Sequence, residues 1–285
     1  MNEPTEFHLK ISDHEQSARP LDLLNQHTGL SRSLIKQAMS KGAVWRQRGK
    51  RVIPLRRNSE HCQDIEQLHF YYHPAILAEQ ALQAELLEDK TDYSVWVKPR
   101  GMRSQGSRYG DHCALVRVAE QQLSRPCRIV HRLDQDACGL ILLAHNKAAA
   151  RHLSELFAAH TIDKRYHIIV EGSFPSESKV VDTELDEKAA HSEFTLLNQL
   201  DQNRSLVAVK ILSGRKHQVR RHAALLGFPL IGDKIYNPNV AKVGKREETA
   251  LRESQKLQLC AQSLVFQDHH GDQQHYEIDS QDWLG

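Results

Sequence analysis

Two short apolar runs, at residues 129–130 and 139–144, enclose a strongly polar turn, and this stretch constrains the fold more than any other. Each run is typical of a buried strand. The turn between them contains two basic and two acidic side chains, His131, Arg132, Asp134 and Asp136. Charges between buried strands cost free energy unless they pair or face a cleft. The stretch is therefore either a salt-bridged turn or a site at which Asp134 performs chemistry.

The net charge of +2 hides an uneven distribution of charge along the chain. Residues 1–17 contain one lysine and four carboxylates, whereas residues 19–57 contain ten lysines and arginines against the single Asp22. Residues 268–285 contain five carboxylates and no lysine or arginine. Such asymmetry indicates a polyanionic partner for the basic region, although a solvated basic face without a ligand has the same composition.

Other bulk features exclude several classes of protein. No run of about 18 apolar residues occurs, and the first residues lack a basic-then-apolar signal pattern, so we expect a cytoplasmic protein outside the membrane. The five cysteines form no Cys-x-x-Cys pair, which predicts reduced and mostly buried thiols. The 18 histidines include no His-Glu-x-x-His motif and no close Cys/His spacing, so we assign no metal ion.

Residues 19–73 have the pattern of a small α/β domain. Regularly spaced leucines predict a short helix that Gly29 closes, and Ser31 is a suitable N-cap for a second helix. Strands are expected within 44–53 and over 65–72. Basic side chains lie on the polar side of the second helix and in the segment after it: Arg32, Lys36, Lys41, Arg46 and Arg48.

Downstream, expected helices and strands alternate. A linking helix is expected over 74–90, a strand over 94–98 that enters a Pro/Gly turn, a helix over 147–160 and a strand over 164–172. Tyr166 lies at the head of the last strand, where a tyrosine is usually a core residue with a solvated hydroxyl.

Residues 211–236 combine a strand, a tight Ser-Gly turn, a basic helix closed by Gly227, and a Pro-led strand. The basic side chains of this helix belong to the sequence Gly-Arg-Lys-His-Gln-Val-Arg of residues 214–220. A helix with this many cations is suited to binding phosphates.

Several motifs resemble those of the RluA-like pseudouridine synthases. His-Arg-Leu-Asp at 131–134, followed by Cys-Gly, is similar to the signature that carries the family's catalytic Asp, and Lys-x-Tyr at 164–166 is similar to its second motif. Gly-Arg-x-His-Gln-x-Arg-x-His at 214–222 resembles the third motif, and Lys-Pro-x-Gly at 98–101 resembles the element that opens the catalytic domain. Residues 19–73 resemble an S-four-like RNA-binding domain in a divergent form. The chain departs from the family pattern at Ala137-Cys138, where Thr-Ser is usual, at Ser213, where Thr is usual, and at Cys260, where His is common.

The resemblance implies an α+β fold: a mixed, largely antiparallel catalytic sheet with flanking helices, preceded by a small α/β RNA-binding domain. We therefore expect an acidic tail (1–18), an S-four-like RNA-binding domain (19–73), a linking helix (74–90) and a catalytic domain (91–285).

The resemblance also implies that the protein isomerises uridines of RNA to pseudouridine without a cofactor. Asp134 is then the catalytic carboxylate, Arg220 its counter-charge, and Tyr166 a residue that stacks on the uracil or moves a proton. Arg132 is expected to fill the gap left by a flipped-out base. The other residues expected at the substrate are His131, Lys164, Arg215, His217 and Gln218, and those expected at the RNA in the small domain are Arg32, Lys36, Lys41, Arg46 and Arg48.

Two other functions fit the sequence. A non-catalytic RNA-binding or ribosome-assembly protein would keep the basic regions but would not need Asp134, Tyr166 and Arg220 together. A hydrolase with Asp134 as nucleophile would need a general base, for which the nearby His131 is the candidate. For the synthase we expect structured rRNA or tRNA as the partner and a monomeric protein.

Overall fold

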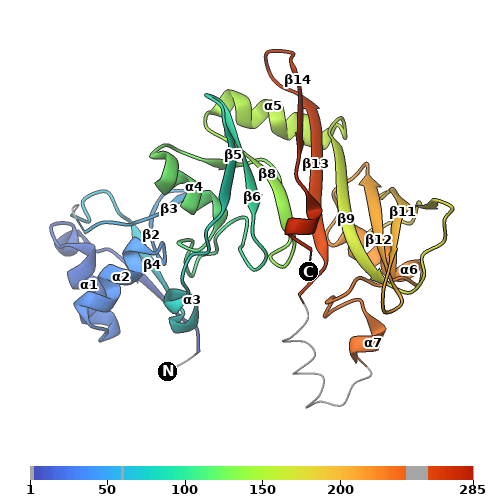
Figure 1. Ribbon diagram of the computed structural model, residues 1–285. Helices are drawn as coiled ribbons and strands as arrows, with labels where there is room; N and C mark the ends of the chain where they lie inside the picture. The colour runs from blue at the N-terminus through green and yellow to red at the C-terminus, as the bar shows by residue number, and fades with distance from the viewer. Residues whose placement is uncertain (1–2, 59–60, 242–255, 285) are drawn as a thin grey trace. The chain divides into compact units, whose positions relative to one another are not determined.

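The structure, a computed structural model, describes residues 3–58, 61–241 and 256–284. The chain divides into two compact units (Figure 1). The amino-terminal unit comprises residues 1–82 and 105–124, and the carboxy-terminal unit comprises residues 83–104 and 125–285. Segment 105–124 therefore belongs to the amino-terminal unit, whereas the sequence assigned it to the catalytic domain.

The amino-terminal unit is a small antiparallel sheet with two helices packed on it. Its elements are β1 (Thr5–Lys10), η1 (Asp13–Glu15), α1 (Pro20–Thr28), α2 (Arg32–Ser40), β2 (Val44–Arg48), β3 (Arg51–Pro54), β4 (Gln67–Tyr72), α3 (Pro74–Ala78) and α4 (Leu115–Leu123). The strand order is β1-β4-β2-β3. Apolar side chains from both helices and from the sheet form one core, which includes Leu21, Leu24, Ile35, Met39, Leu68 and Phe70.

The two helices expected in this unit are confirmed together with their ends. Gly29 has a φ of 67° and its N–H bonds to Asn25 O, which ends α1 in the left-handed conformation that glycine adopts at low cost. Ser31 Oγ accepts the Leu34 N–H at 3.3 Å and caps α2. The first residues form a strand: β1 pairs with β4, so the acidic tail expected over 1–18 is wrong.

The linking helix expected over 74–90 is also wrong. Only Pro74–Ala78 is helical, and Glu85–Asp89 is a strand that pairs with residues 94–97. The leucines of this segment have helical spacing, but the edge of a sheet offers them a partner that local sequence does not reveal. The Pro-led strand expected after residue 228 is reduced to an isolated bridge between Leu230 and Val170.

A long mixed sheet forms the carboxy-terminal unit (Figure 1). Its elements are β5 (Glu85–Asp89), β6 (Tyr93–Lys98), β7 (Arg128–Ile129), β8 (Cys138–Ala144), α5 (Lys147–Ala158), β9 (Asp163–Glu171), β10 (Lys179–Val181), β11 (Ser192–Leu200), β12 (Arg204–Ile211), α6 (Gln218–Leu225), α7 (Pro238–Ala241), β13 (Leu259–Gln267), β14 (Gln273–Glu277) and η2 (Ser280–Asp282). The order is β10-β11-β12-β9-β13-β8-β6-β5, with β14 paired to β13 and β7 to β8. Strands β8 and β13 run parallel, and the other strand pairs of the described residues run antiparallel. The expected α+β class with a mixed, largely antiparallel sheet is confirmed.

The parallel pair β8–β13 depends on one glycine. Gly139 lies opposite Ala261, with a φ of 109°, and a Cβ at this position would collide with the Ala261 backbone. On one face of the same strands, α5 buries Ala149 and Leu153 against the strand side chains Leu142 and Leu264. The sheet is therefore packed closely beside the turn that carries Asp134.

Two expectations about the whole chain concern thiols and membranes. Four of the five cysteines are buried, as predicted: Cys62, Cys127, Cys138 and Cys260. Among the helices in the described part of the chain, none combines the length and apolar character needed to span a bilayer.

Candidate active site

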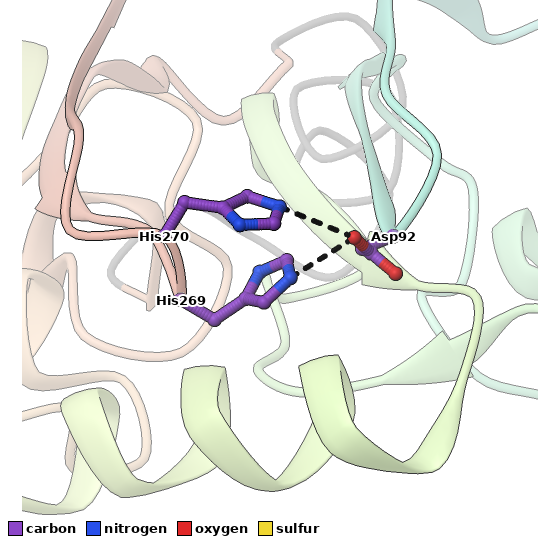
Figure 2. A group of neighbouring side chains, drawn as sticks. All are labelled: Asp92, His269 and His270. Carbon is purple, nitrogen blue, oxygen red and sulfur yellow. Dashed lines mark ion pairs between the residues drawn. The ribbon is translucent and has the colours of Figure 1, made fainter.

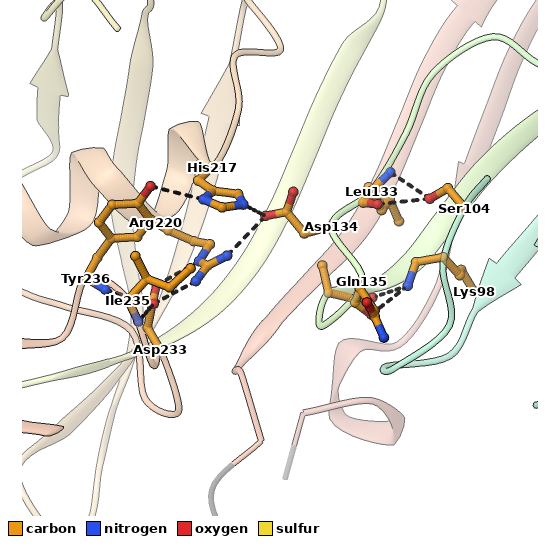
Figure 3. Close-up of polar contacts among 11 residues, drawn as sticks. Lys98, Ser104, Leu133, Asp134, Gln135, His217, Arg220, Asp233, Ile235 and Tyr236 are labelled. Atoms are coloured by element: carbon orange, nitrogen blue, oxygen red, sulfur yellow. Dashed lines mark hydrogen bonds and ion pairs between the residues drawn. The ribbon is translucent and has the colours of Figure 1, made fainter. Parts of the chain in front are cut away.

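The turn between β7 and β8 holds Asp134, and a buried lysine organises it (Figure 3). Lys98, at the end of β6, is fully buried, and its Nζ donates to Gln135 O at 3.2 Å and to Ala137 O at 2.6 Å. It also donates to Pro99 O and Met102 O. Burial lowers the pKa of Lys98 to about 8. A cation with these carbonyl partners fixes the path of the turn on the carboxy-terminal side of Asp134.

A serine fixes the other side of the turn. Ser104 Oγ donates to Leu133 O at 2.9 Å and accepts the Leu133 N–H at 3.1 Å. Gly101 N donates to Gln135 O at 2.8 Å. The residues before and after Asp134 are therefore both held by the segment 98–104 (Figure 3). Of the residues that hold this turn, Lys98 and Gly101 were marked in the sequence by the motif Lys-Pro-x-Gly. No sequence pattern marked Ser104.

Arg220 of α6 connects two carboxylates. Its Nε and Nη2 donate to the two oxygens of Asp233 at 2.7 Å each, and its Nη1 donates to Asp134 Oδ2 at 3.4 Å. The Arg220 side chain is 5% exposed, the Asp233 side chain is fully buried, and the Asp134 side chain is 29% exposed. The predicted pairing of Arg220 with Asp134 is present, but Asp233 is the closer partner.

Asp233 was missed as a functional residue. Burial favours its neutral acid, but hydrogen bonds from Arg220 and from the N–H groups of Tyr236 and Ile235 hold its pKa below the usual range. The sequence pattern Gly-Asp-x-x-Tyr at 232–236 could have marked Asp233 as functional. The spacing alone did not reveal that its partner is Arg220. Asp233 is the anion that compensates the buried guanidinium.

His217 approaches the same carboxylate oxygen from the start of α6. Its backbone has a φ of 54°, its Nδ1 lies 3.0 Å from Tyr236 Oη, and its Nε2 lies 3.8 Å from Asp134 Oδ2. Burial lowers the pKa of His217, so the ring is neutral at pH 7. The contact with Asp134 is therefore polar and is not an ion pair at that pH.

Tyr166 of β9 lines the same pocket as Asp134 and Arg220. Burial, with the nearby Asp134 carboxylate as a second cause, raises the pKa of Tyr166. The phenol is therefore protonated at neutral pH and can donate a hydrogen bond or a proton. The structure brings together the three residues expected to carry the chemistry.

Besides His217, the pocket includes three more of the residues expected to contact the substrate. Arg132 is exposed and lines it. Gln218 Oε1 accepts from Ser213 Oγ and Arg215 N, while its Nε2 donates to His191 O, so it shapes the turn before α6. Arg215 lines the pocket with its Nε on Ala189 O. The whole lining is Arg132, Leu133, Asp134, Ala137, Tyr166, Ile211, Gly214, Arg215, His217, Gln218, Val219, Arg220 and Leu259.

His131 and Lys164 do not line this pocket, so the substrate contacts expected for them stay predictions. His131 Nε2 accepts the Leu142 N–H at 2.9 Å and its ring stacks on Phe157 at 4.2 Å. Burial lowers the pKa of His131 to about 3. Lys164 is buried and its Nζ donates to Leu212 O at 3.2 Å. Both side chains support the packing around the sheet.

The basic residues of the amino-terminal unit have mixed environments. Lys41 Nζ donates to Leu77 O at 2.5 Å, and Arg32 pairs with Asp22 at 2.6 Å. Lys36 is exposed, and Arg48 has a side chain that is 70% exposed beside Asp64. Arg46 and Arg48, together with Arg51, line a hollow in this unit; its other lining residues are Gln47, Ile53 and Asp64. Lys41 thus serves the unit's own backbone, whereas Lys36, Arg48 and Arg51 are exposed.

The donor set around Asp134 does not resemble a metal site. The carboxylate lies beside the Arg220 guanidinium, and a cation in that place would be repelled. The site is suited instead to a carboxylate that acts on an organic substrate in a small polar pocket.

Comparison with known proteins agrees with the motifs. Residues 92–225 match the family model for RNA pseudouridylate synthase. The chain is 27% identical over 250 residues to an uncharacterized RNA pseudouridine synthase of Aquifex aeolicus, with 78% of each chain covered. It is 29% identical over 188 residues to the dual-specificity RNA pseudouridine synthase RluA of Vibrio parahaemolyticus, which covers 59% of this chain and 72% of that protein. The match spans only about half the length of two ribosomal large subunit pseudouridine synthases, 48% of synthase C of Vibrio cholerae and 52% of synthase D of Zymomonas mobilis.

The fold has a counterpart among solved structures. The structure of human RNA pseudouridylate synthase domain containing 1 aligns with a TM-score of 0.57 and 20% identity, covering 70% of this chain and 86% of that chain. The fold and the motif residues gathered in one pocket define a pseudouridine synthase domain. Residues 92–225 carry a domain of the RNA pseudouridylate synthase family, and the chain is similar to RluA-like members of that family.

Proposed function

We propose that this protein converts specific uridines of rRNA or tRNA to pseudouridine, with Asp134 as the catalytic carboxylate. The observation that carries the proposal is the position of Asp134 between a fixed backbone turn and Arg220, in a pocket that Tyr166 also lines. The isomerisation breaks the bond from uracil N1 to C1′ and forms a bond from C5 to C1′, so it requires no redox cofactor.

The carboxylate has one of two tasks at the sugar. It attacks C1′ as a nucleophile, or it stabilises and deprotonates the sugar after the glycosidic bond breaks. Both routes need a carboxylate at this position, and Arg220 Nη1 donates a hydrogen bond to Asp134 Oδ2. The protonated hydroxyl of Tyr166 can bond to the detached uracil and transfer a proton.

The target base must leave its stack to reach a pocket of this kind. Arg132 is exposed, two residues before Asp134, and we assign it the space that the flipped base vacates. The exposed arginines Arg48 and Arg51, which line the hollow of the amino-terminal unit, supply phosphate contacts. The cytoplasmic location and the monomeric state stay predictions, with the buried thiols as support for a reducing compartment.

The replacement of Thr-Ser by Ala137-Cys138 is compatible with activity. Cys138 is fully buried, and its thiol faces Leu259 O and Trp283 O at 3.4 and 3.6 Å. At position 137, Lys98 binds the backbone carbonyl, and every residue type has this group. The departure from the family pattern therefore affects the packing of the buried Cys138 side chain more than the chemistry at Asp134.

The direct test is to incubate the protein with total RNA from a strain that lacks it and to measure pseudouridine in the digested nucleosides. A rise in pseudouridine with no release of free uracil is expected. Binding of RNA without conversion would indicate the non-catalytic RNA-binding protein, and released uracil would indicate the hydrolase. The hydrolase has less support because His131 Nε2 is occupied by the Leu142 N–H.

A further inference from the structure

Two turns of the carboxy-terminal unit bring together a carboxylate and two imidazoles. Asp92 lies in the turn between β5 and β6, and His269 and His270 lie in the turn between β13 and β14. Figure 2 shows the three side chains converging on one point. We propose that these three residues bind a divalent transition-metal ion of the zinc class, at a site separate from the pocket around Asp134.

The distances leave room for one ion among the three donors. Asp92 Oδ2 lies 3.0 Å from His269 Nε2 and 3.8 Å from His270 Nε2, and the three donor atoms lie within 4.8 Å of one another. With bonds of about 2.0–2.1 Å, tetrahedral zinc separates its ligand atoms by roughly 3.4 Å. Only small side-chain rotations are needed to reach that spacing.

Neighbouring groups hold the carboxylate in the orientation that a metal requires. Asn146 Nδ2, at the start of α5, donates to Asp92 Oδ1, so Oδ2 is the oxygen that faces the histidines. Hydrogen bonds of this kind orient ligands in known metal sites and are part of their design. The same Asn146 caps α5 through Ala149 N, so its position is fixed by the helix.

The turn that carries the histidines is also fixed. Asp268 Oδ1 accepts the N–H groups of His270 and Asp272 at 3.0 and 3.1 Å, and its Oδ2 accepts Gln274 Nε2 at 2.9 Å. The two imidazoles are therefore presented by a hydrogen-bonded hairpin end, and a metal ion would not have to order the loop first.

An ion pair with a protonated histidine is the simpler explanation of the contact at 3.0 Å. It does not explain the second ring. The rings of His269 and His270 have centroids 3.9 Å apart and both direct Nε2 towards the same oxygen. Two imidazolium ions so close would repel each other, whereas one shared metal ion binds both rings in their neutral form.

The donor chemistry selects the class of ion. Two imidazole nitrogens and one carboxylate oxygen suit zinc and its first-row neighbours, while magnesium and calcium prefer oxygen ligands. Three protein ligands leave a fourth position for water.

The proposed ion would brace the strands that form the active site. Asp92 immediately precedes β6, which ends at Lys98, the residue that holds the Asp134 turn. His269 follows β13, which begins at Leu259 in the pocket lining. Metal at the far ends of β6 and β13 would therefore stabilise the unit and would not take part in the reaction.

The test uses the full-length protein, freed of metal by chelation and then given zinc chloride or cobalt chloride. Binding of one equivalent with the visible bands of cobalt, and a rise in Tm of about 5–10 °C at zinc a hundredfold above its Kd, are expected. Asp92→Asn and His269→Gln should lose both responses. His275→Gln, an exposed histidine on β14 of the same hairpin, should keep them.

The proposal is overturned if the wild-type protein shows no zinc-dependent rise in Tm, or if His269→Gln retains it. Should His269→Gln fold poorly by circular dichroism, the exposed His270→Gln gives the second measurement with the same expected loss. These readouts do not involve RNA, so their failure leaves the proposed synthase activity untouched, and the absence of that activity leaves the metal site untouched.

Discussion

At the scale of single residues, the pocket depends on one arginine shared by two carboxylates. Arg220 makes both short bonds to Asp233 and reaches Asp134 at 3.4 Å with its remaining nitrogen. Burying a guanidinium without an anion costs free energy. Asp233 supplies that anion, so the position of Arg220 does not depend on Asp134. The chemistry proposed for Asp134 therefore leaves the buried pair of Arg220 and Asp233 intact.

Replacing Asp233 tests this division of roles. Asp233→Asn should lower the free energy of unfolding by about 3–5 kcal/mol, because it removes one partner of a buried pair, and should reduce kcat with it. Urea unfolding and turnover measure both effects. Asp186→Asn is a matched control, since Asp186 also pairs with an arginine, Arg221, but is 65% exposed, and it should cost less than about 1 kcal/mol. Equal costs at the two positions would mean that burial of the pair is irrelevant.

The hydroxyl of Tyr166 is expected to matter for turnover and not for binding. Tyr166→Phe keeps the ring in the pocket but removes the proton donor, so kcat should fall about a hundredfold or more. The Kd for RNA should stay within a small factor of the wild-type value. A near-normal kcat would reduce Tyr166 to a surface on which the uracil stacks.

At the scale of elements, the turn around Asp134 is held by residues distant in the sequence. Caps, alternation and the three motifs predicted α1, α2, β6, β8, α5 and β9 and the residues Asp134, Tyr166 and Arg220, because those signals are local. The bond from Lys98 to Ala137 O and the pair of Arg220 with Asp233 depend on how strands and turns meet, which spacing does not encode. The same reason explains the error over 74–90, where a sheet edge overrode helical spacing.

His131 shows how an element can make stability depend on pH. Its ring must be neutral to accept the Leu142 N–H, and burial lowers its pKa to about 3, below the unfolded value of about 6.5. As pH falls below about 6.5 the unfolded chain binds a proton that the folded chain does not, so stability is lost.

Urea unfolding at pH 7.5 and pH 5.0 measures this effect. The wild-type protein should lose about 2 kcal/mol more between the two pH values than His131→Gln, in which an amide oxygen can accept the same N–H. Comparing the two proteins cancels the contributions of other titrating groups. The same loss in both would show that His131 titrates alike in the folded and unfolded states.

At the scale of the whole molecule, the two units are interleaved in sequence. Segment 105–124 belongs with residues 1–82, and the half-buried pair of Arg56 and Asp111 joins the two parts of that unit. Deleting residues 1–73 would therefore leave 105–124 without its packing partners. Point substitutions on the surface of the amino-terminal unit are the cleaner way to examine RNA binding.

Three exposed cations of this unit are suitable for the purpose. Lys36→Gln, Arg48→Gln and Arg51→Gln together should flatten the plot of log affinity against log salt by about two to three units, if each residue contacts one phosphate. The charge-preserving variants Arg48→Lys and Arg51→Lys should keep the slope. Turnover of a short RNA fragment should be unchanged. Identical slopes for the glutamine variants and the wild-type protein would identify the basic region as a solvated face.

The central claim is that Asp134 performs the chemistry of a pseudouridine synthase, and one substitution tests it most directly. Asp134→Asn preserves shape and leaves Arg220 paired with Asp233, so the fold and RNA affinity should be retained while pseudouridine formation falls at least about a hundredfold. Asp136→Asn, an exposed acid in the same turn, should remain active. Substantial pseudouridine formation by Asp134→Asn, or an equal loss in Asp136→Asn, would contradict the assignment.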